Sequence, residues 1–428
     1  MTQWNNGNQL DDTTLTDIFS AVMLRGLRAF LILLIVVAPI TTPGQIDPEK
    51  RRLVQLGYNQ YLEGHGPIAG YGFFYYNKPN FLSSNLTLRL AVAPIYLDAD
   101  FGFSRLLGPN TDLAVGIAGG GFADTYSEIR RGEYRRRESF TGHGGEVSVS
   151  IYHRFNPDQI VPCWAIARGR LHQSYYRADG DTDELFEVPD DRTSFSVRTG
   201  IRLGGLEPSL TEPLALELSG WHETQFRGQS GPYGFAGDRA VESQSHLLWT
   251  RALLKYTFDQ TEQLVVVSLT AGTSFEADRF SSYRLGGLLP FVSDFPLSLP
   301  GYYFQEISAR RFVLLNGEYS FPFVRSKNWR LTMYGATGPV EYVEGLKQLG
   351  KWHTGVGGGI SYISPSGAWF MTLVYGHGFD AIRDDRRGAN QVGLLFQYDF
   401  EAKPRGKKRW FIPGVDPYQS RGGERIFR

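Results

Sequence analysis

Apolar and polar residues alternate one by one along many short runs of this sequence, and a period of two is typical of β-strands. One face of the run 193–203 carries Phe195, Val197, Thr199, Ile201 and Leu203. The other face carries Ser196, Arg198, Gly200 and Arg202. The runs 142–155 and 214–226 alternate in the same way. The pattern predicts an all-β fold whose strands each have one apolar and one polar face.

The connections between these runs also alternate, in length. Short turns occur at 156–159, 259–263, 325–328 and 364–367. Longer segments lie between them, at 127–141, 178–192, 227–243, 279–311 and 378–390. Barrels of the bacterial outer membrane have short periplasmic turns and longer external loops. We therefore predict a transmembrane antiparallel β-barrel, because a soluble sandwich has no reason to keep its long loops at one end.

Composition agrees with a barrel. Aromatic residues make up 14% of the 428 residues and there are 50 glycines, yet mean hydropathy is only −0.26. Strands that face lipid on one side and a polar lumen on the other, with aromatic girdles, produce such values. The formal net charge of zero gives no electrostatic case for a nucleic-acid partner. The lone cysteine, Cys163, leaves no intrachain disulfide and no paired-cysteine metal site.

The long apolar run Ala29–Ile40 follows two arginines and is short for a membrane-spanning helix, which needs roughly 20 residues. It fits the apolar core of a secretory signal cleaved after Gly44, with Met23 as the true start; an uncleaved anchor helix is the alternative. Export then leaves a closed barrel as the way to enter a membrane. We expect a signal region at 1–44, a periplasmic lead-in at 45–66, the barrel at 67–400 and a basic periplasmic tail at 401–428.

Strand-like runs can be counted back from the carboxyl terminus, and twelve lie between residues 112 and 400. The region from Arg52 to Leu107 must add an even number to close the barrel. If Leu86–Leu106 is one strand paired with Ile68–Tyr76, the barrel has fourteen strands. If that run breaks near Pro94 and Val54–Leu62 also pairs, it has sixteen.

The stretch Tyr283–Phe323 predicts a long loop that folds back into the barrel. It opens with Gly286-Gly287, passes through Leu299-Pro300-Gly301-Tyr302 and returns as a strand. These residues, with Asn316–Pro322 and the glycine-rich run His353–Gly367, resemble the barrel of the BamA/TamA-like outer-membrane superfamily, also called bacterial surface antigens. The resemblance implies sixteen strands and an inward loop near 288–311. The final strand resembles the family's carboxyl-terminal β-signal at Gly393, Phe396, Tyr398 and Phe400.

The chain departs from the family at two positions that form an ion pair there. Pro300 stands where the loop arginine would be, and Ala336 where its aspartate partner would be. The resemblance also implies periplasmic POTRA domains for insertases, and we expect none ahead of this barrel. These departures weaken the case for insertase activity. We expect the loop to be held by aromatic packing or by other charges, from Phe291, Phe295, Tyr302, Tyr303, Phe304, Arg310 and Arg311.

Several arginines are expected to face the lumen: Arg89, Arg154, Arg198, Arg202 and Arg330. Rings of basic side chains favour anions in pores, unless acidic residues such as Glu217 pair with them and fill the lumen. The histidines His143, His222, His353 and His377 lie near strand ends, and no spacing places a nucleophile beside a base. The acidic segment 178–192 and the basic segment 130–137 are expected to be solvated external loops.

We expect a pore or a structural subunit of an outer-membrane complex, with no enzymatic activity, cofactor or metal. The alternatives are a divergent insertase or translocation component working with a partner, and a barrel hydrolase using His143 or His222. The expected partners are outer-membrane lipids including lipopolysaccharide, the barrel-assembly machinery, and a protein bound through residues 401–428.

Overall fold

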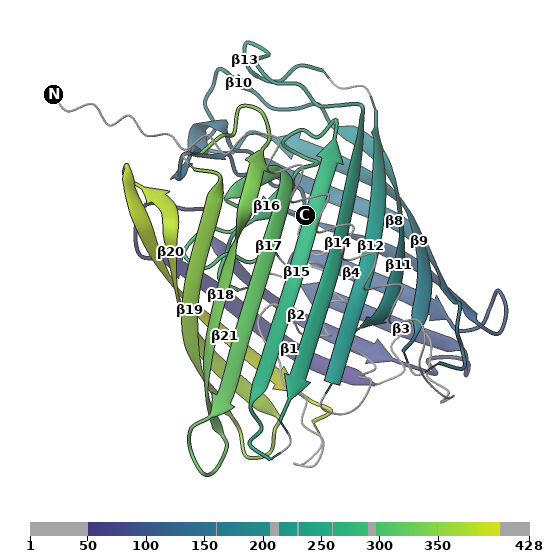
Figure 1. Cartoon of the computed structure of the whole chain (residues 1–428). Coiled ribbons are helices and arrows are strands. Elements are labelled where there is room, and N and C mark those ends of the chain that lie inside the picture. Colours follow the sequence, from purple (N-terminus) through teal and green to yellow (C-terminus); the bar gives the residue numbers. More distant parts are fainter. Residues whose placement is uncertain are drawn as a thin grey trace.

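The computed structural model describes residues 50–159, 161–205, 214–228, 231–258, 260–289, 297–348 and 350–402. Within them the chain forms one antiparallel β-barrel (Figure 1). The expected signal region 1–44, its cleavage site and the tail from residue 403 lie outside the described residues. No helix in the described ranges is long and apolar enough to cross a membrane.

Sixteen strands form the barrel wall in the described part of the chain. The first eight are β1 Arg51–Tyr61, β2 Ala69–Lys78, β3 Leu86–Ala93, β4 Tyr96–Phe103, β5 Thr111–Gly120, β8 Thr141–Arg154, β9 Cys163–Arg177 and β11 Arg192–Gly205. The second eight are β12 Leu214–Arg227, β14 Gln244–Thr257, β15 Leu264–Phe275, β17 Ile307–Pro322, β18 Trp329–Tyr342, β19 Trp352–Ile363, β20 Trp369–Arg383 and β21 Arg386–Asp399. The short β16 Tyr283–Leu285 pairs with β17 above β15.

First and last strands close the barrel. β1 pairs with β21 over nine residues, from Leu53↔Asp399 to Tyr61↔Gln391. The sixteen-strand prediction is confirmed, because β3 and β4 are separated by the turn at Pro94 and β1 pairs on both sides. The barrel begins at Arg51, so the expected boundary at residue 67 is too late. The strand β1 includes most of Val54–Leu62, the run that the sixteen-strand alternative requires, and it alternates like the other strands.

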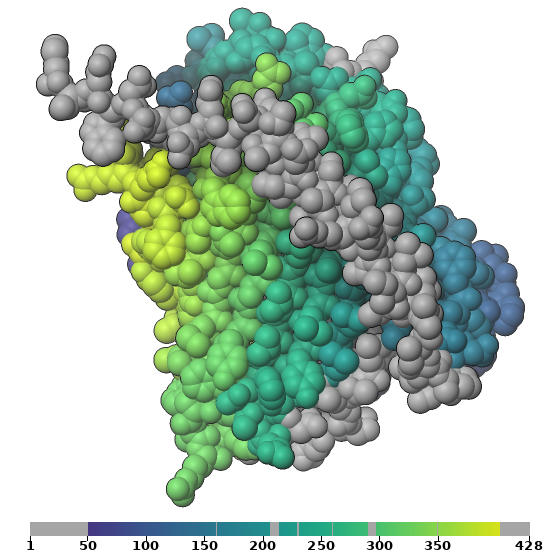
Figure 2. Space-filling view, in the orientation of Figure 1, coloured from purple at the N-terminus to yellow at the C-terminus, as the bar shows by residue number. Residues whose placement is uncertain are grey.

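The predicted two-faced strands are confirmed. On β11, Phe195 and Ile201 face outward and are 44% and 48% exposed, whereas Ser196 and Arg202 are buried on the lumen side. Outward apolar side chains recur around the wall, and Figure 2 shows part of the outer surface that the green strands form together. A closed barrel with an apolar outer surface is the architecture of outer-membrane proteins.

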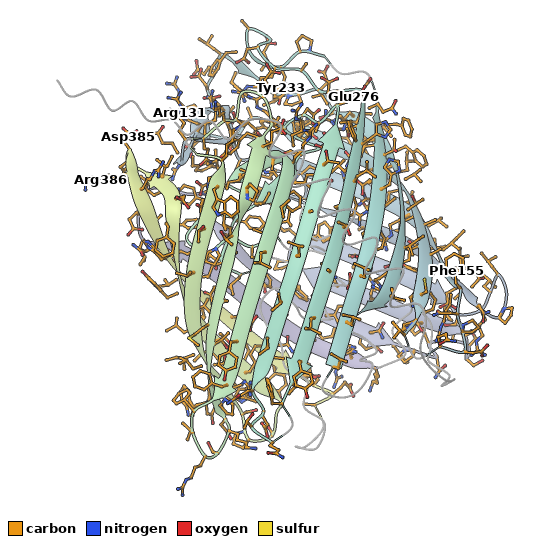
Figure 3. All side chains as sticks on the ribbon, in the orientation of Figure 1. Arg131, Phe155, Tyr233, Glu276, Asp385 and Arg386 are labelled. Carbon is orange, nitrogen blue, oxygen red and sulfur yellow. The ribbon has the colours of Figure 1, made fainter. Side chains whose placement is uncertain are left out.

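Long and short connections lie at opposite ends of the barrel. Figure 3 places Phe155, which follows β8, at the short-turn end and Tyr233 and Glu276 at the other. The segment 378–390, expected to be a loop, is instead a continuation of β20 and β21 joined by Asp384 and Asp385. Both residues have positive φ, 48° and 60°, as a two-residue hairpin turn requires.

Five minor elements lie in the described parts of the long loops after β5, β9 and β12. The pair β6 Ile129–Arg130 and β7 Glu133–Tyr134 forms a small hairpin, followed by the 3-10 turn η1 Arg136–Glu138. Strands β10 Phe186–Glu187 and β13 Gly234–Phe235 pair with each other at the top of Figure 1. The pairing of β10 with β13 joins the external loops after β9 and β12.

Candidate functional site: the lumen loop

The segment 286–306, here called the lumen loop, starts with a sharp turn made by two glycines. Gly286 and Gly287 have φ of 130° and 96°, which residues with a Cβ rarely adopt. Gly286 N–H donates to Leu297 O at 3.0 Å, and Leu299 N–H donates to Gly287 O at 3.0 Å. The glycine pair predicted from sequence therefore closes the base of the loop.

Glycines on the inner wall let the loop backbone lie directly against β19 and β20. Gly301 has a φ of 85°, and a Cβ there would overlap the backbone of Gly378. A Cβ at Gly355 would overlap the carbonyl of Pro300, and one at Gly378 would meet the Tyr302 ring at 2.8 Å. The wall glycines thus let the Leu299–Tyr302 motif take the predicted inward position.

A buried ion pair, here called the anchor pair, holds the returning end of the loop. Arg383, the last residue of β20, donates to both carboxylate oxygens of Glu306 at 3.0 and 2.8 Å. Their side chains are 3% and 0% exposed. The Arg383 guanidinium also lies 3.5 Å from the centroid of the Tyr303 ring. Two parallel hydrogen bonds and a stacked ring fix both position and orientation.

Further polar contacts hold the middle of the loop. The Gln391 amide on β21 is oriented to donate to Tyr302 O at 3.1 Å and to accept from Gly301 N–H at 2.7 Å. The Tyr302 hydroxyl lies 3.0 Å from Nδ1 of His353 on β19. Tyr302 is fully buried. The loop backbone therefore has hydrogen-bond partners on the wall, as a buried loop requires.

The expected arrangement of charges was wrong in detail. Arg310 and Arg311 pair with Glu341 near the rim and do not hold the loop. The aromatic packing is present at Tyr302 and Tyr303, while Phe291 and Phe295 lie outside the described residues. Ala336 is buried within the lumen cluster that includes Tyr302. In place of the ion pair that the resemblance implied, the structure has apolar packing at Ala336 and the anchor pair between the loop and β20.

The loop also contacts the junction of the first and last strands. The Tyr61 hydroxyl at the end of β1 accepts from Phe304 N–H at 2.9 Å, and the Tyr61 and Tyr303 rings meet edge to face. Glu63 accepts two hydrogen bonds from Asn390, from its backbone N–H at 2.5 Å and its amide at 2.6 Å. Displacing the loop would therefore remove contacts from the external end of the β1–β21 junction.

The five predicted arginines all lie on the inner face, and carboxylates neutralise several of them. Arg89 pairs with Asp98 at 3.2 Å and also with Asp100. Arg198 pairs with Glu223 at 2.7 Å, and Arg202 lies close enough to Glu217 to stabilise its charge. The remaining two bind backbone oxygens: Arg154 that of Gln159, and Arg330 those of Glu262 and Ser320. The paired arrangement, one of the two expectations, is present.

The β-signal residues occupy the closing strand as expected from their alternation. Gly393 faces inward, where a Cβ would meet the Val374 side chain at 2.8 Å. Phe396 and Tyr398 face outward, and Phe400 follows the strand with its ring 4.8 Å from that of Tyr398. Phe400 N–H donates to Arg52 O at 2.8 Å, which continues the junction with β1.

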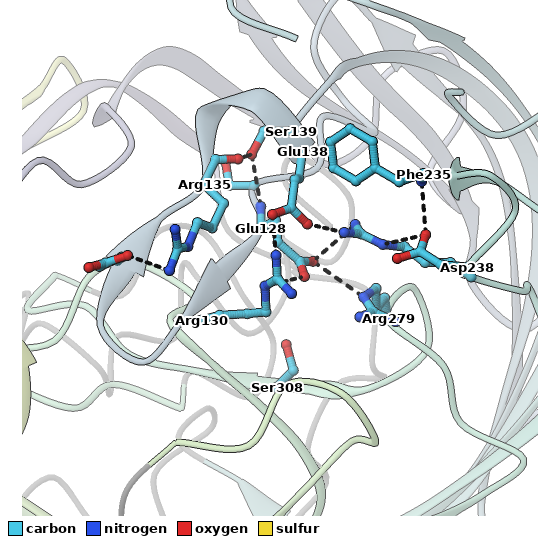
Figure 4. A network of polar contacts seen from close by, with 12 residues as sticks. Glu128, Arg130, Arg135, Glu138, Ser139, Phe235, Asp238, Arg279 and Ser308 are labelled. Atoms are coloured by element: carbon cyan, nitrogen blue, oxygen red, sulfur yellow. Dashed lines mark hydrogen bonds and ion pairs between the residues drawn. The ribbon is translucent and has the colours of Figure 1, made fainter. Parts of the chain in front are cut away.

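Four long loops fold over the external end into an external cap, defined here by segments 121–140, 178–191, 228–243 and 276–285. Its centre is the buried carboxylate of Glu128 (Figure 4). Glu128 lies 3.3 Å from both Arg130 and Arg279, and 3.7 Å from Arg239. Rings pack beside it: Tyr126, Phe140, Tyr176, Phe186, Tyr233 and Phe280.

Burial and charge shift the pKa values in this cap. Burial raises the pKa of Tyr126, and the neighbouring Glu128 carboxylate adds to the effect. Burial lowers the pKa of Arg279, but Glu128 more than reverses this and raises it above the ordinary value. The segments expected to be solvated also pair with each other, through Arg137 with Asp183 and Arg136 with Asp181 at 3.6 Å.

In the described part of the chain, the four histidines singled out from the sequence, His143, His222, His353 and His377, each contact a different residue. His143 accepts from Phe122 N–H, His222 stacks on His246, and His377 contacts Asn390. Sequence reasoning missed His172, whose ring lies 2.7 Å from Asp124 and 3.5 Å from Glu146. Among the described residues no group of three histidine, cysteine or acidic side chains is placed to hold a metal ion.

The comparisons with known proteins agree on the fold. No protein-family model and no curated protein matches the sequence. Among solved structures, CdiB from Escherichia coli is similar with a TM-score of 0.56 and 12% identity, over 84% of this chain and 67% of that one. CdiB from Acinetobacter baumannii gives 0.52 and 11%, over 82% of this chain and 60% of that one.

The structure of BamA from Haemophilus ducreyi lacking POTRA domains 1–3 gives a TM-score of 0.50 and 9% identity, over 82% of this chain and 71% of that one. The chain thus spans 60% of the Acinetobacter protein, 67% of the Escherichia coli protein and 71% of the BamA chain. Identities this low show the shared fold. The resemblance to BamA/TamA-like barrels is confirmed at that level.

Proposed function

We propose that the chain is a gated conduit of the bacterial outer membrane whose resting state is kept closed by the lumen loop. The observation that carries the proposal is the anchor pair Glu306–Arg383, a buried ion pair between the loop and the wall. A buried pair of this kind is weak evidence for stability, and switching elements are among its best-attested uses. The proposal assigns no catalytic activity to the chain.

Two further observations support a gate. The loop can be excised without straining the wall, because its ends meet: a Cβ at Gly286 would lie 3.1 Å from Glu306 N. Among the described lumen arginines, Arg89 and Arg198 pair with carboxylates, which weakens the attraction of their charges for anions. Passage through the lumen therefore depends on displacing the loop.

Planar-bilayer conductance tests the proposal. A variant with residues 288–305 replaced by a short glycine-serine linker is expected to conduct in larger and more frequent steps than the intact protein. Arg251→Met is the matched control, because it breaks another buried lumen ion pair, with Glu217 at 2.7 Å. The gate is refuted if the excised variant is as silent as the intact protein, or if the control conducts equally.

A second candidate, a component that inserts or translocates other proteins, is favoured by one observation. The loop touches the β1–β21 junction through Tyr61 and Tyr303, so loop movement and opening of this junction are coupled. Cysteines at Leu56 and Phe396, which are partners across the junction, would fix it in a Cys163→Ser background. If oxidation stops the insertion or translocation of other proteins in cells and leaves the conductance unchanged, this candidate is favoured over the conduit.

A further inference from the structure

The wall of the barrel has a weak place away from the first and last strands. β2 pairs with β3 over five residues, from Phe74↔Val92 to Lys78↔Leu88. Every other ladder between neighbouring wall strands in the described ranges has at least eight pairs, as β3–β4 does. The cause is local: β3 ends at Ala93, and Pro94, which has no N–H to donate, starts the turn to β4.

β2 continues past the last of these pairs for five residues, up to Ala69, and there pairs with β1 alone within the described chain. Phe400 N–H donates to Arg52 O, and Leu62 N–H donates to Asn390 O. Even-numbered residues of β1 thus point their backbone groups at β21, and odd-numbered ones at β2.

The register then decides which residues of β2 face away from β1. Gly57↔Tyr71 is a hydrogen-bonded pair, because Gly57 is odd-numbered. The neighbours Gly70 and Gly72 therefore direct their N–H and C=O groups toward the side that β3 leaves uncovered. An edge of this kind is a template for another strand.

The surroundings of this edge are apolar on both sides. Outside, Leu56 and Tyr58 flank the two glycines and are 49% and 47% exposed, and Ile68 is 93% exposed. Inside, the buried cluster contains Tyr71, Tyr75, Tyr96 and Ala123. Hydrocarbon offers no hydrogen bonds to the backbone groups of such an edge.

We propose that the edge of β2 at Gly70 and Gly72 binds an extended segment of another membrane protein as an added strand. The occupant is an extended strand with apolar side chains on both faces, because it meets lipid outside and the aromatic cluster inside. A lipid chain would leave the backbone groups unpaired. Outside, the apolar side chains of the bound strand would contact Leu56 and Tyr58, which cover the two glycines.

The carboxyl-terminal end of the chain fits this edge less well. β1 starts at Arg51 and β21 ends at Asp399, both at the short-turn end, whereas Gly70 lies near the opposite end of β2. The carboxyl-terminal segment carries Lys403, Arg405, Lys407, Lys408 and Arg409. Placing those charges against an apolar cluster is unfavourable.

Hydrogen exchange of the full chain in lipid nanodiscs tests the proposal, with glycine-selective nitrogen labelling and NMR detection. The matched control is Gly220, an outward glycine of β12 paired on both sides, with Ile201 and Thr250. The amides of Gly70 and Gly72 are expected to exchange faster than that of Gly220. A capped synthetic peptide of alternating valine and tyrosine is expected to slow them by about tenfold or more.

Two variants separate strand pairing from loose apolar adsorption. Gly70→Pro removes the N–H that faces the edge and costs no hydrogen bond to β1, so peptide protection at Gly72 should be lost. Gly72→Ala keeps its N–H and should retain protection at Gly70. Heat-modifiable mobility on gels establishes that both variants fold.

Three results would overturn the proposal. The first is that, without peptide, the amide of Gly70 or Gly72 exchanges as slowly as that of Gly220. The edge would then already be covered, by a terminal segment, a second copy or lipid. Another is rapid exchange that the peptide leaves unchanged. The third is equal protection by peptide in folded Gly70→Pro. None of these outcomes bears on the lumen loop, so the conduit and the strand-binding edge stand or fall separately.

Discussion

Replacing Arg383 by methionine should release the lumen loop. The change keeps an unbranched side chain but leaves the Glu306 carboxylate, 0% exposed, without its cation. Removing one partner of a buried pair typically costs about 3–5 kcal/mol. The ratio of released to bound loop should therefore rise by roughly a hundredfold to a few thousandfold, since 1.4 kcal/mol is a factor of ten.

Cysteine accessibility measures this ratio. In a Cys163→Ser background, Leu299→Cys places a thiol at a loop position that is 1% exposed. Its labelling by a water-soluble maleimide should be slow in the parent and much faster with Arg383→Met. Adding Glu306→Gln should recover much of the protection, because the stranded charge is then gone.

The control is Arg251→Met, which removes the ion-pair partner of Glu217 in the lumen but lies outside the anchor pair. It should leave the labelling of the loop near the parental rate. Equal labelling of the parent and of Arg383→Met would refute the role of the anchor pair. If the control also labels faster, the loss of any ion pair in the lumen exposes the loop, and the anchor pair has no special role.

Two further substitutions test the wall glycines that contact the lumen loop and the external cap. Gly378→Ala should lower stability by about 1–3 kcal/mol, because the new methyl meets the Tyr302 ring; Gly317→Ala, with open space around it, should change the melting temperature far less. Glu128→Gln should open the cap, because three arginines around it lose their shared carboxylate. Trypsin should then cleave the loops faster, whereas Glu133→Gln, whose pair is half exposed, should behave like the parent.

Local signals in the sequence were enough for the wall. Alternation along 193–203 assigned outward and inward faces correctly, because one face meets lipid and the other water. Pro94 marked the break between β3 and β4, since proline ends a ladder. The run 51–61 falls inside the expected lead-in, although the sixteen-strand alternative already needed Val54–Leu62 as a strand.

The anchor pair shows why the site could not be read in the same way. Glu306 and Arg383 lie 77 positions apart, and neither stands where the resembling family keeps its ion pair. The sequence showed only that Pro300 and Ala336 remove that pair. Arg383 can reach Glu306 because β20 extends to residue 383. The sequence predicted a loop at 378–390, so it did not predict this part of the strand.

The sequence by itself determined that the chain forms a barrel, how its strands face and that a glycine-rich loop returns to the lumen, because these follow from local periodicity and backbone freedom. Only the tertiary structure decided which contacts hold the loop and which external loops pair with one another. It also decided that the ladder between β2 and β3 is short. These features depend on register between distant strands. A change in strand length at Ala93 or Arg383 alters them without changing the alternation pattern.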